Sequence, residues 1–148
     1  MRPDLAAGEL AGVATPPPGA AYALCLPVLT PAPNAVMRMH WSERRRYING
    51  LAWQMRAAFL GPLPVAPIAR SRVKVWRHAI QALDVDALAG SAKFLLDILQ
   101  PPSARHPYGL GVIANDRADC CDLVVRWMPV KHRPDQRTVI EISDLRGE

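Results

Sequence analysis

The strongest pattern of apolar and polar positions lies between Leu83 and Leu99. Two aspartates one residue apart are followed by apolar side chains that recur every three or four residues, which is the spacing of one helix face. The apolar residues of this face are Leu88, Ala92, Leu95, Leu96 and Leu99. We therefore expect an amphipathic helix that carries the carboxylates of Asp84 and Asp86 at its start.

Residues 22–28 and 42–60 show the two patterns of the N-terminal half. The first segment alternates enough to predict a strand, in which Pro27 suits an edge or an end. Residues 30–34 hold two prolines and an asparagine and predict a turn. The second segment has apolar side chains at helical intervals and predicts a helix with Ser42 as its N-cap.

Three more segments have the composition of strands. Residues 72–79 lead into the acidic pair, and residues 123–130 and 138–142 follow the second helix. The polar residues 131–137 connect the last two strands and predict that they pair as a hairpin. The predicted order is β-α-β-α-β-β, which describes one α/β (α+β) domain with a small mixed sheet and two helices.

Length and composition fit this fold class. A chain of 148 residues that is half apolar and about a fifth charged has the make-up of one globular domain. Residues 1–20 are rich in Ala, Gly and Pro and predict a flexible tail, so the folded domain is expected over residues 21–148. Because neither a signal peptide nor an apolar run of about 18 residues is apparent, we expect a soluble protein without a membrane segment.

The net charge indicates the class of binding partner, and the cysteine positions indicate the redox compartment. A formal charge of +5 and a pI near 9.6 favour a polyanionic partner such as a nucleic acid. Cys120 and Cys121 are adjacent and Cys25 is distant, so we expect no disulfide framework and a reducing cytoplasm. Adding His132 to this pair does not produce the spacing of a zinc site.

An arginine cluster opens the predicted helix 42–60. Cations at a helix N-terminus oppose the helix dipole, so a partner outside the helix is expected to favour them there. Phosphate oxygens are such a partner, and the alternative is a solvated charged surface. The candidate DNA-binding residues are Arg38, His40, Arg44, Arg45 and Arg46.

Lys93 shares a helix face with Asp86. Seven residues make about two turns, or about 10 Å along the axis, and the lysine is expected to lean back toward the acids. Gly90 lies between them and suggests open space for a bulky ligand. The alternative is that Asp86 caps the helix and Lys93 pairs with Asp97, four residues on.

The acidic pair and the helix after it resemble the RusA family of Holliday junction resolvases, over about residues 22–143. The specific part is Asp84-Val85-Asp86 followed by Leu88-Ala89-Gly90-Ser91-Ala92-Lys93 and Leu95-Leu96-Asp97. Asp116 occupies the place of the family's paired acids. Further matches are Pro33-Asn34, Met39-His40-Trp41 and the segment Arg137-Thr138-Val139-Ile140-Glu141-Ile142.

This resemblance implies a homodimeric, metal-dependent endodeoxyribonuclease that resolves four-way DNA junctions. It implies Asp84, Asp86 and Asp116 as catalytic carboxylates around Mg²⁺, with Mn²⁺ as a substitute, and Lys93 beside them. Three converging carboxylates repel one another unless a cation neutralises them, which is consistent with a metal site. Because the motif specifies metal chemistry and not the shape of the DNA, other branched or flap substrates are a further possibility.

The chain departs from the family pattern at two positions. Ala87 replaces an asparagine, and Asn115 replaces the first of the paired acids. These departures suggest an alternative function, a protein that binds junctions or other branched DNA with reduced or lost catalysis.

Overall fold

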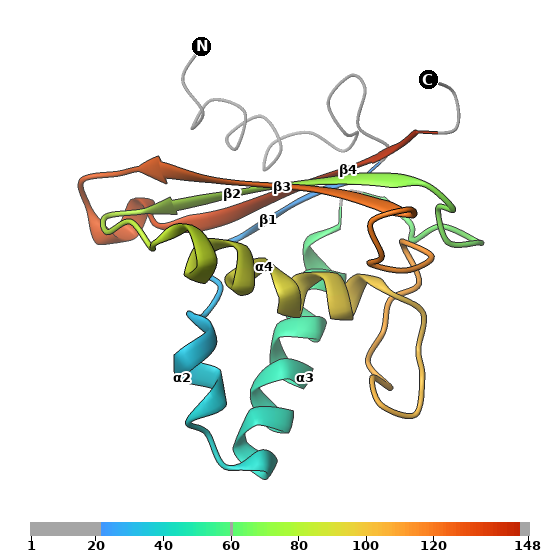
Figure 1. The fold of residues 1–148 in the computed structure, drawn as a ribbon, viewed down its shortest axis with the longest axis horizontal. Coiled ribbons are helices and arrows are strands. Elements are labelled where there is room, and N and C mark those ends of the chain that lie inside the picture. Colours follow the sequence, from blue (N-terminus) through green and yellow to red (C-terminus); the bar gives the residue numbers. More distant parts are fainter. Residues whose placement is uncertain (1–21, 60, 146–148) are drawn as a thin grey trace.

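The computed structural model describes residues 22–59 and 61–145 and has the expected mixture of helices and strands. The expected tail at residues 1–20 lies outside the described residues. The α+β class is confirmed, with a third helix in the described part of the chain (Figure 1). The elements are β1 (Tyr22–Leu26), α2 (Pro33–Met37), α3 (Trp41–Ala58), β2 (Ser71–Ala79), α4 (Val85–Leu99), β3 (Cys121–Pro129), a 3-10 helix (Arg133–Asp135) and β4 (Arg137–Asp144).

The four strands form one mixed sheet in the order β1-β4-β2-β3. β3 runs parallel to β2, and β4 runs antiparallel to both β1 and β2. The predicted hairpin of β3 and β4 is therefore wrong, because β2 lies between them. Burial explains the difference: Thr138, Val139 and Ile140 of β4 are all buried, as suits a central strand, whereas the alternate residues of β3 are exposed or half-buried, as suits an edge.

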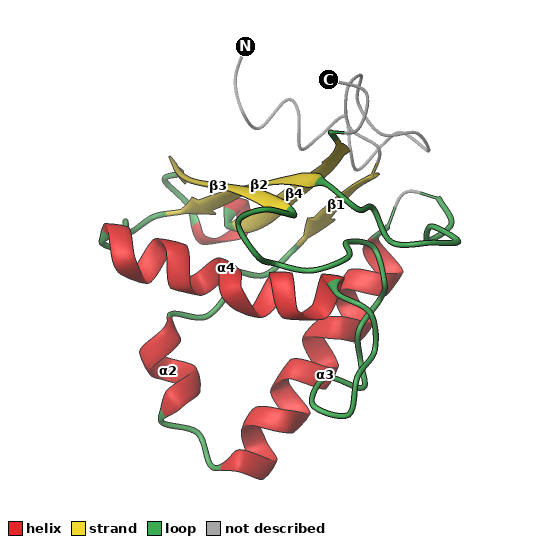
Figure 2. Ribbon diagram, turned by 45° about the vertical axis from the view of Figure 1, so that its right-hand side comes forward, coloured by secondary structure: helices red, strands yellow, loops and turns green. Residues whose placement is uncertain are grey.

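The helices cover one face of the sheet (Figures 1 and 2). On that face Leu24, Ile140, Val75 and Val125 form one row across the four strands. α4 lies along the sheet, and its apolar side chains join those of α3 in the same core. The helical members of this core are Ile48, Leu51, Ala52 and Met55 of α3, and Ala92, Leu95, Leu96, Ile98 and Leu99 of α4.

Helix starts differ from the sequence predictions in three places. A turn was expected at residues 30–34, but Pro33 begins α2, because the fixed φ of proline suits the first helical position. His40 caps α3 in place of Ser42: its Nδ1 accepts a hydrogen bond of 3.2 Å from the Ser42 amide. Asp84, not Asp86, caps α4. The prediction for Pro27 is confirmed, because β1 is an edge strand and ends at Leu26, just before this proline.

Gly90 has a packing role that the sequence did not reveal. A Cβ at this position would lie 2.5 Å from Cγ of Pro33, which is closer than real side chains approach. The glycine therefore lets α2 pack closely on α4. The expected open space beside Gly90 is filled by a proline of the same chain.

The connection from α4 to β3 places a long loop at the C-terminal end of α4. Parallel strands start at the same edge of a sheet, so the helix between β2 and β3 must return the chain to that edge. The loop is fastened there by hydrogen bonds of 2.8 Å from the Leu110 amide to the Ile98 carbonyl and from the Val112 amide to the Leu99 carbonyl. No helix in the described ranges is long and apolar enough to cross a bilayer.

Candidate active site

Lys93 and Asp116 meet at the side of α4. The ammonium of Lys93 donates a hydrogen bond to Oδ2 of Asp116, which comes from the loop 23 residues further along the chain. The same ammonium lies 3.6 Å from Oδ1 of Asp97, one helical turn on. Two of the four residues that the resemblance implies in catalysis are thus in direct contact, with Asp97 as a third member. We call Lys93, Asp97 and Asp116 the acid–lysine cluster.

The two carboxylates of this cluster stabilise the charged form of Lys93. The hydrogen bond that Lys93 donates to Asp116 raises the pKa of Lys93, burial acts against this shift, and the charge of Asp97 adds to it. Lys93 is therefore a stable cation at neutral pH, able to donate hydrogen bonds but not to accept a proton. The carboxylates are 18% and 23% exposed, against 58% for the lysine, so they lie deeper than the cation that bridges them.

Asp84 and Asp86 lie at the other end of α4. Asp84 is exposed and its Oδ1 accepts a 2.8 Å hydrogen bond from the Ala87 amide, while Asp86 is exposed in the first turn. Because the Lys93 ammonium approaches Asp97, it points away from Asp86 and does not lean back toward it as expected. Asp86 and Asp97 are eleven residues apart, or about 16 Å along the helix axis.

The three predicted metal ligands are not grouped in one place. Among residues 22–59 and 61–145, no three His, Cys, Asp or Glu side chains are arranged to hold a metal ion. The topology explains this, since Asp84 follows the carboxyl end of β2 while Asp116 precedes the start of the parallel strand β3, at the opposite edge. Of the two predictions for Lys93, the lean toward Asp86 is wrong and the pairing with Asp97 is confirmed.

Asn115 and Ala87 have local roles where the chain departs from the family pattern. Oδ1 of Asn115 accepts a 2.7 Å hydrogen bond from the Arg117 amide, which holds the turn that carries Asp116. The Ala87 amide is the donor that Asp84 caps. Neither residue supplies a carboxylate. Each takes part in a hydrogen bond that holds the backbone next to a predicted site aspartate.

The predicted DNA-binding residues lie around the junction of α2 and α3, at the end of these helices remote from the sheet (Figure 1). Arg38, His40, Arg45 and Arg46 are exposed, and we call this group the basic tip. Arg44 differs, because it is half-buried and its Nη2 donates a 3.3 Å hydrogen bond to the Met39 carbonyl.

Trp41 adds an aromatic surface to the basic tip. Its side chain is 66% exposed, and the centroid of its ring lies 5.5 Å from that of His40. Trp41 was not among the predicted DNA-binding residues. Its position beside the predicted helix cap, among cations, was the available signal.

The three described cysteines have free thiols. Cys121 is buried at the start of β3, and burial is the main cause that raises the pKa of its thiol. Neutral, buried thiols are poor nucleophiles, so Cys121 contributes to packing.

Comparison with models of known protein families gave no match, and comparison with curated proteins gave none. The resemblance stated above therefore depends on the motif residues themselves. What the structure adds is the contact of Lys93 with Asp116 and the exposure of the basic tip.

Proposed function

We propose that this protein is a divalent-metal-dependent endodeoxyribonuclease that acts on branched DNA, with the four-way junction as its substrate. The observation that carries the proposal is the contact between Lys93 and Asp116. These residues are separated by 23 positions, and only folding brings them together. The same two residues are implied in catalysis by the motif, independently of any contact.

Carboxylate oxygens match the preference of Mg²⁺, which proteins often bind through one or two carboxylates together with water and substrate phosphate. Two acidic pairs are candidates here: Asp84 with Asp86, which are two positions apart at the start of α4, and Asp97 with Asp116, which both contact Lys93. In the second pair, the Lys93 ammonium contacts both carboxylates, which supports a preference for a cation at this position. When bound, a divalent ion supplies charge neutralisation at phosphate and activation of water.

The protein's own residues then have separate tasks. At the acid–lysine cluster, Asp97 and Asp116 would hold the divalent ion, and the ammonium of Lys93 donates hydrogen bonds to a phosphate oxygen as negative charge develops on it. Asp84 and Asp86, at the other end of α4, would form a second acidic pair apart from that phosphate. Arg38, His40, Arg45 and Arg46 bind phosphates further along the strand. A homodimer would present two equivalent sites to the two symmetric strands of a junction. We place the protein in the cytoplasm, where DNA and reduced thiols coexist.

A second candidate function is binding of branched DNA without cleavage. It is favoured by the lack of any three-ligand acidic group among the described residues. Under this reading the acid–lysine cluster is a structural ion pair that holds the loop on α4.

A cleavage assay distinguishes the two functions. The purified protein is incubated with an end-labelled four-way junction in Mg²⁺ or Mn²⁺, and products are compared with binding in a gel shift. We expect symmetric nicks from the wild type and at least about a 100-fold loss for Asp116→Asn, with binding retained. Asp122→Asn is the matched control, since Asp122 forms an exposed ion pair with Arg72 on β2.

Three outcomes decide between the proposals. Binding without nicks in either metal would establish the binding protein and overturn the nuclease. Equal cleavage by wild type and Asp116→Asn would remove the assigned site. Absence of both binding and cleavage would overturn both functions.

A further inference from the structure

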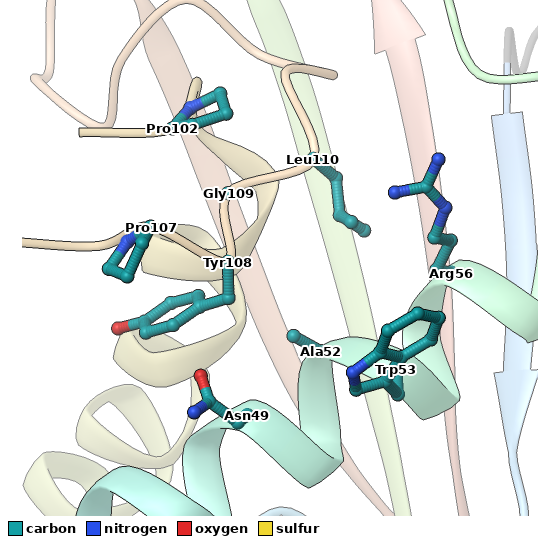
Figure 3. A pocket seen from close by; sticks show the side chains of 9 residues that line it. All are labelled: Asn49, Ala52, Trp53, Arg56, Pro102, Pro107, Tyr108, Gly109 and Leu110. Atoms are coloured by element: carbon teal, nitrogen blue, oxygen red, sulfur yellow. The ribbon is translucent and has the colours of Figure 1, made fainter.

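A cavity of about 490 Å³ lies between α3 and the loop that joins α4 to β3 (Figure 3). Its volume is within the usual range of small-molecule sites, which is about 300–1,000 Å³. The residues that line this cavity have no role in the proposed function, and the sequence pattern did not predict a cavity. Its helical wall consists of Asn49, Ala52, Trp53 and Arg56, which are spaced so that they share one face of α3.

The loop wall is held in place before any ligand arrives. The hydroxyl of Tyr108 and Nδ1 of His106 are 2.6 Å apart and form a hydrogen bond. The backbone at Gly109 runs so close to the chain at Gln100 that a Cβ there would lie 2.4 Å from the Gln100 carbonyl oxygen. A fixed wall reduces the entropy that binding must overcome.

The cavity combines a free aromatic face with a positive charge. Trp53 is 72% exposed, and Figure 3 shows its ring beside the Arg56 side chain, across the cavity from Tyr108. The nine lining residues include the cation Arg56 and contain no Asp or Glu. The cavity therefore favours an anion that also carries a flat apolar group.

The cavity also adjoins the acid–lysine cluster. The amide of Leu110, in the cavity lining, donates a 2.8 Å hydrogen bond to the carbonyl of Ile98, the residue after Asp97, so the loop wall is joined to α4 next to this cluster. Burial is the main cause that raises the pKa of the Tyr108 phenol, and the charge of Asp97 adds to the shift. Away from this cluster, one face of α3 leads back toward the basic tip. It carries Arg56, Trp53, Asn49 and Arg45, at intervals of three, four and four residues. One helix face thus leads from the basic tip to the cavity.

We propose that this cavity holds one unpaired nucleotide of the DNA strand that approaches the acid–lysine cluster. Trp53 stacks on the base, the Asn49 amide faces its hydrogen-bonding edge, and Arg56 binds its phosphate. The inference rests on the proposed function, since it names an unpaired nucleotide at the branch as the part of the substrate that the protein reads. Bases in duplex DNA cannot enter, because they are stacked and paired.

The test compares single-stranded and duplex DNA. Binding of labelled (dT)16 and of a blunt duplex of the same length is measured by fluorescence anisotropy at about 0.15 M salt, with wild type, Trp53→Ala, Trp53→Phe and Arg56→Gln. Stacking on one aromatic is worth about 1–3 kcal/mol, so Trp53→Ala should weaken (dT)16 binding about 5- to 150-fold. Trp53→Phe should restore most of this, and duplex binding should change less than about 2-fold.

Arg70→Gln is the matched control for Arg56→Gln, because Arg70 is an exposed arginine outside the cavity. We expect Arg56→Gln to weaken (dT)16 binding more than Arg70→Gln does. Equal losses in these two variants, or equal losses of single-stranded and duplex binding in Trp53→Ala, would overturn the inference. Wild-type affinity of Trp53→Ala for (dT)16 would overturn it as well.

The result is separable from the junction assay. If the wild type cleaves junctions and Trp53→Ala keeps full (dT)16 affinity, the cavity inference fails and the nuclease remains. If the wild type does not cleave but Trp53→Ala loses (dT)16 binding selectively, the cavity inference holds and catalysis fails. Trp53 is largely exposed, so circular dichroism should show a folded variant, and Arg56→Gln provides the second test of the same cavity.

Discussion

Gly90→Ala and Gly50→Ala should have opposite effects on stability, although both replace a glycine within a helix. Replacing glycine by alanine in a helix interior stabilises by about 0.5–1 kcal/mol when space is available. At Gly50 of α3 a new Cβ meets nothing within 4 Å, so this gain should appear. At Gly90 of α4 the new Cβ would lie 2.5 Å from Pro33 Cγ.

The cost at Gly90 follows from the rigidity of its neighbour. Pro33 is the first residue of α2, and its ring cannot rotate away as a flexible side chain would. α2 must therefore shift, and overpacking of this kind costs about 1–3 kcal/mol. After the propensity gain, Gly90→Ala should destabilise by up to about 2 kcal/mol, while Gly50→Ala stabilises.

Urea unfolding followed by far-ultraviolet circular dichroism measures both variants, with the double variant Pro33→Ala/Gly90→Ala as the third arm. Removing Cγ of Pro33 leaves its Cβ 3.6 Å from the new methyl, which is an ordinary contact. The double variant should therefore recover most of the lost stability, with a coupling energy of about 1–2 kcal/mol. Equal stabilisation by Gly90→Ala and Gly50→Ala would show that α2 does not pack on α4 at this point, and the account of Gly90 would be refuted.

Three further predictions concern charges. Because the pKa of Lys93 is raised in the folded state, its contribution is present below its ordinary pKa of 10.5 and is lost as pH rises through the folded value. Urea titrations of wild type and Lys93→Met should differ by less than about 1 kcal/mol at pH 7 to 9.5 and converge above pH 10.5, and a difference that grows at high pH would contradict this. Burial raises the pKa of Glu141 above its ordinary value of 4.5, against the charge of Lys74, so the folded state loses stability as pH rises from 4.5 through the folded pKa. The Glu141→Gln variant should therefore be more stable than wild type at pH 7 and lose this advantage by pH 4. Arg45→Gln should reduce the salt slope of junction binding by about 1, measured as log K against log salt, whereas an unchanged slope would place Arg45 outside the DNA contact.

Local patterns predicted most of the secondary structure, whereas the pairing of strands distant in sequence was not predicted correctly. The period of Leu88, Ala92, Leu95 and Leu99 located α4 because each helical hydrogen bond closes within four residues. The partner of β4 could not be predicted in this way, since β2 pairs with it from some sixty residues earlier in the chain. Connection length suggested a hairpin, and the burial of both faces of β4 decided against it.

In the candidate site, too, local contacts could be predicted from the sequence and contacts with distant segments could not. The pairing of Lys93 with Asp97 could be predicted from their spacing of four residues on one helix, whereas the contact of Lys93 with Asp116 depends on where the loop returns to α4. Gly90 suggested open space because the sequence does not show that Pro33 fills it. The cavity at Trp53 had one signal, a tryptophan opposite the apolar face of Leu51 and Met55, and its second wall comes from a distant loop.

The two ends of α4 cannot serve one phosphate at the same time. Its 15 residues span about 22 Å, and about 16 Å separates Asp86 from Asp97 along the axis, whereas each aspartate side chain extends only a few ångströms from the helix. The C-terminal half also holds the returning loop, the Lys93 cation and the neighbouring cavity, while Pro33 of α2 packs against the helix at Gly90, between the two halves. A phosphate bound at the acid–lysine cluster therefore has Asp97 and Asp116 as its near carboxylates. In the proposed nuclease Asp97 is then more than a surface partner for Lys93, because any cation that displaces the ammonium from Asp116 must also neutralise Asp97.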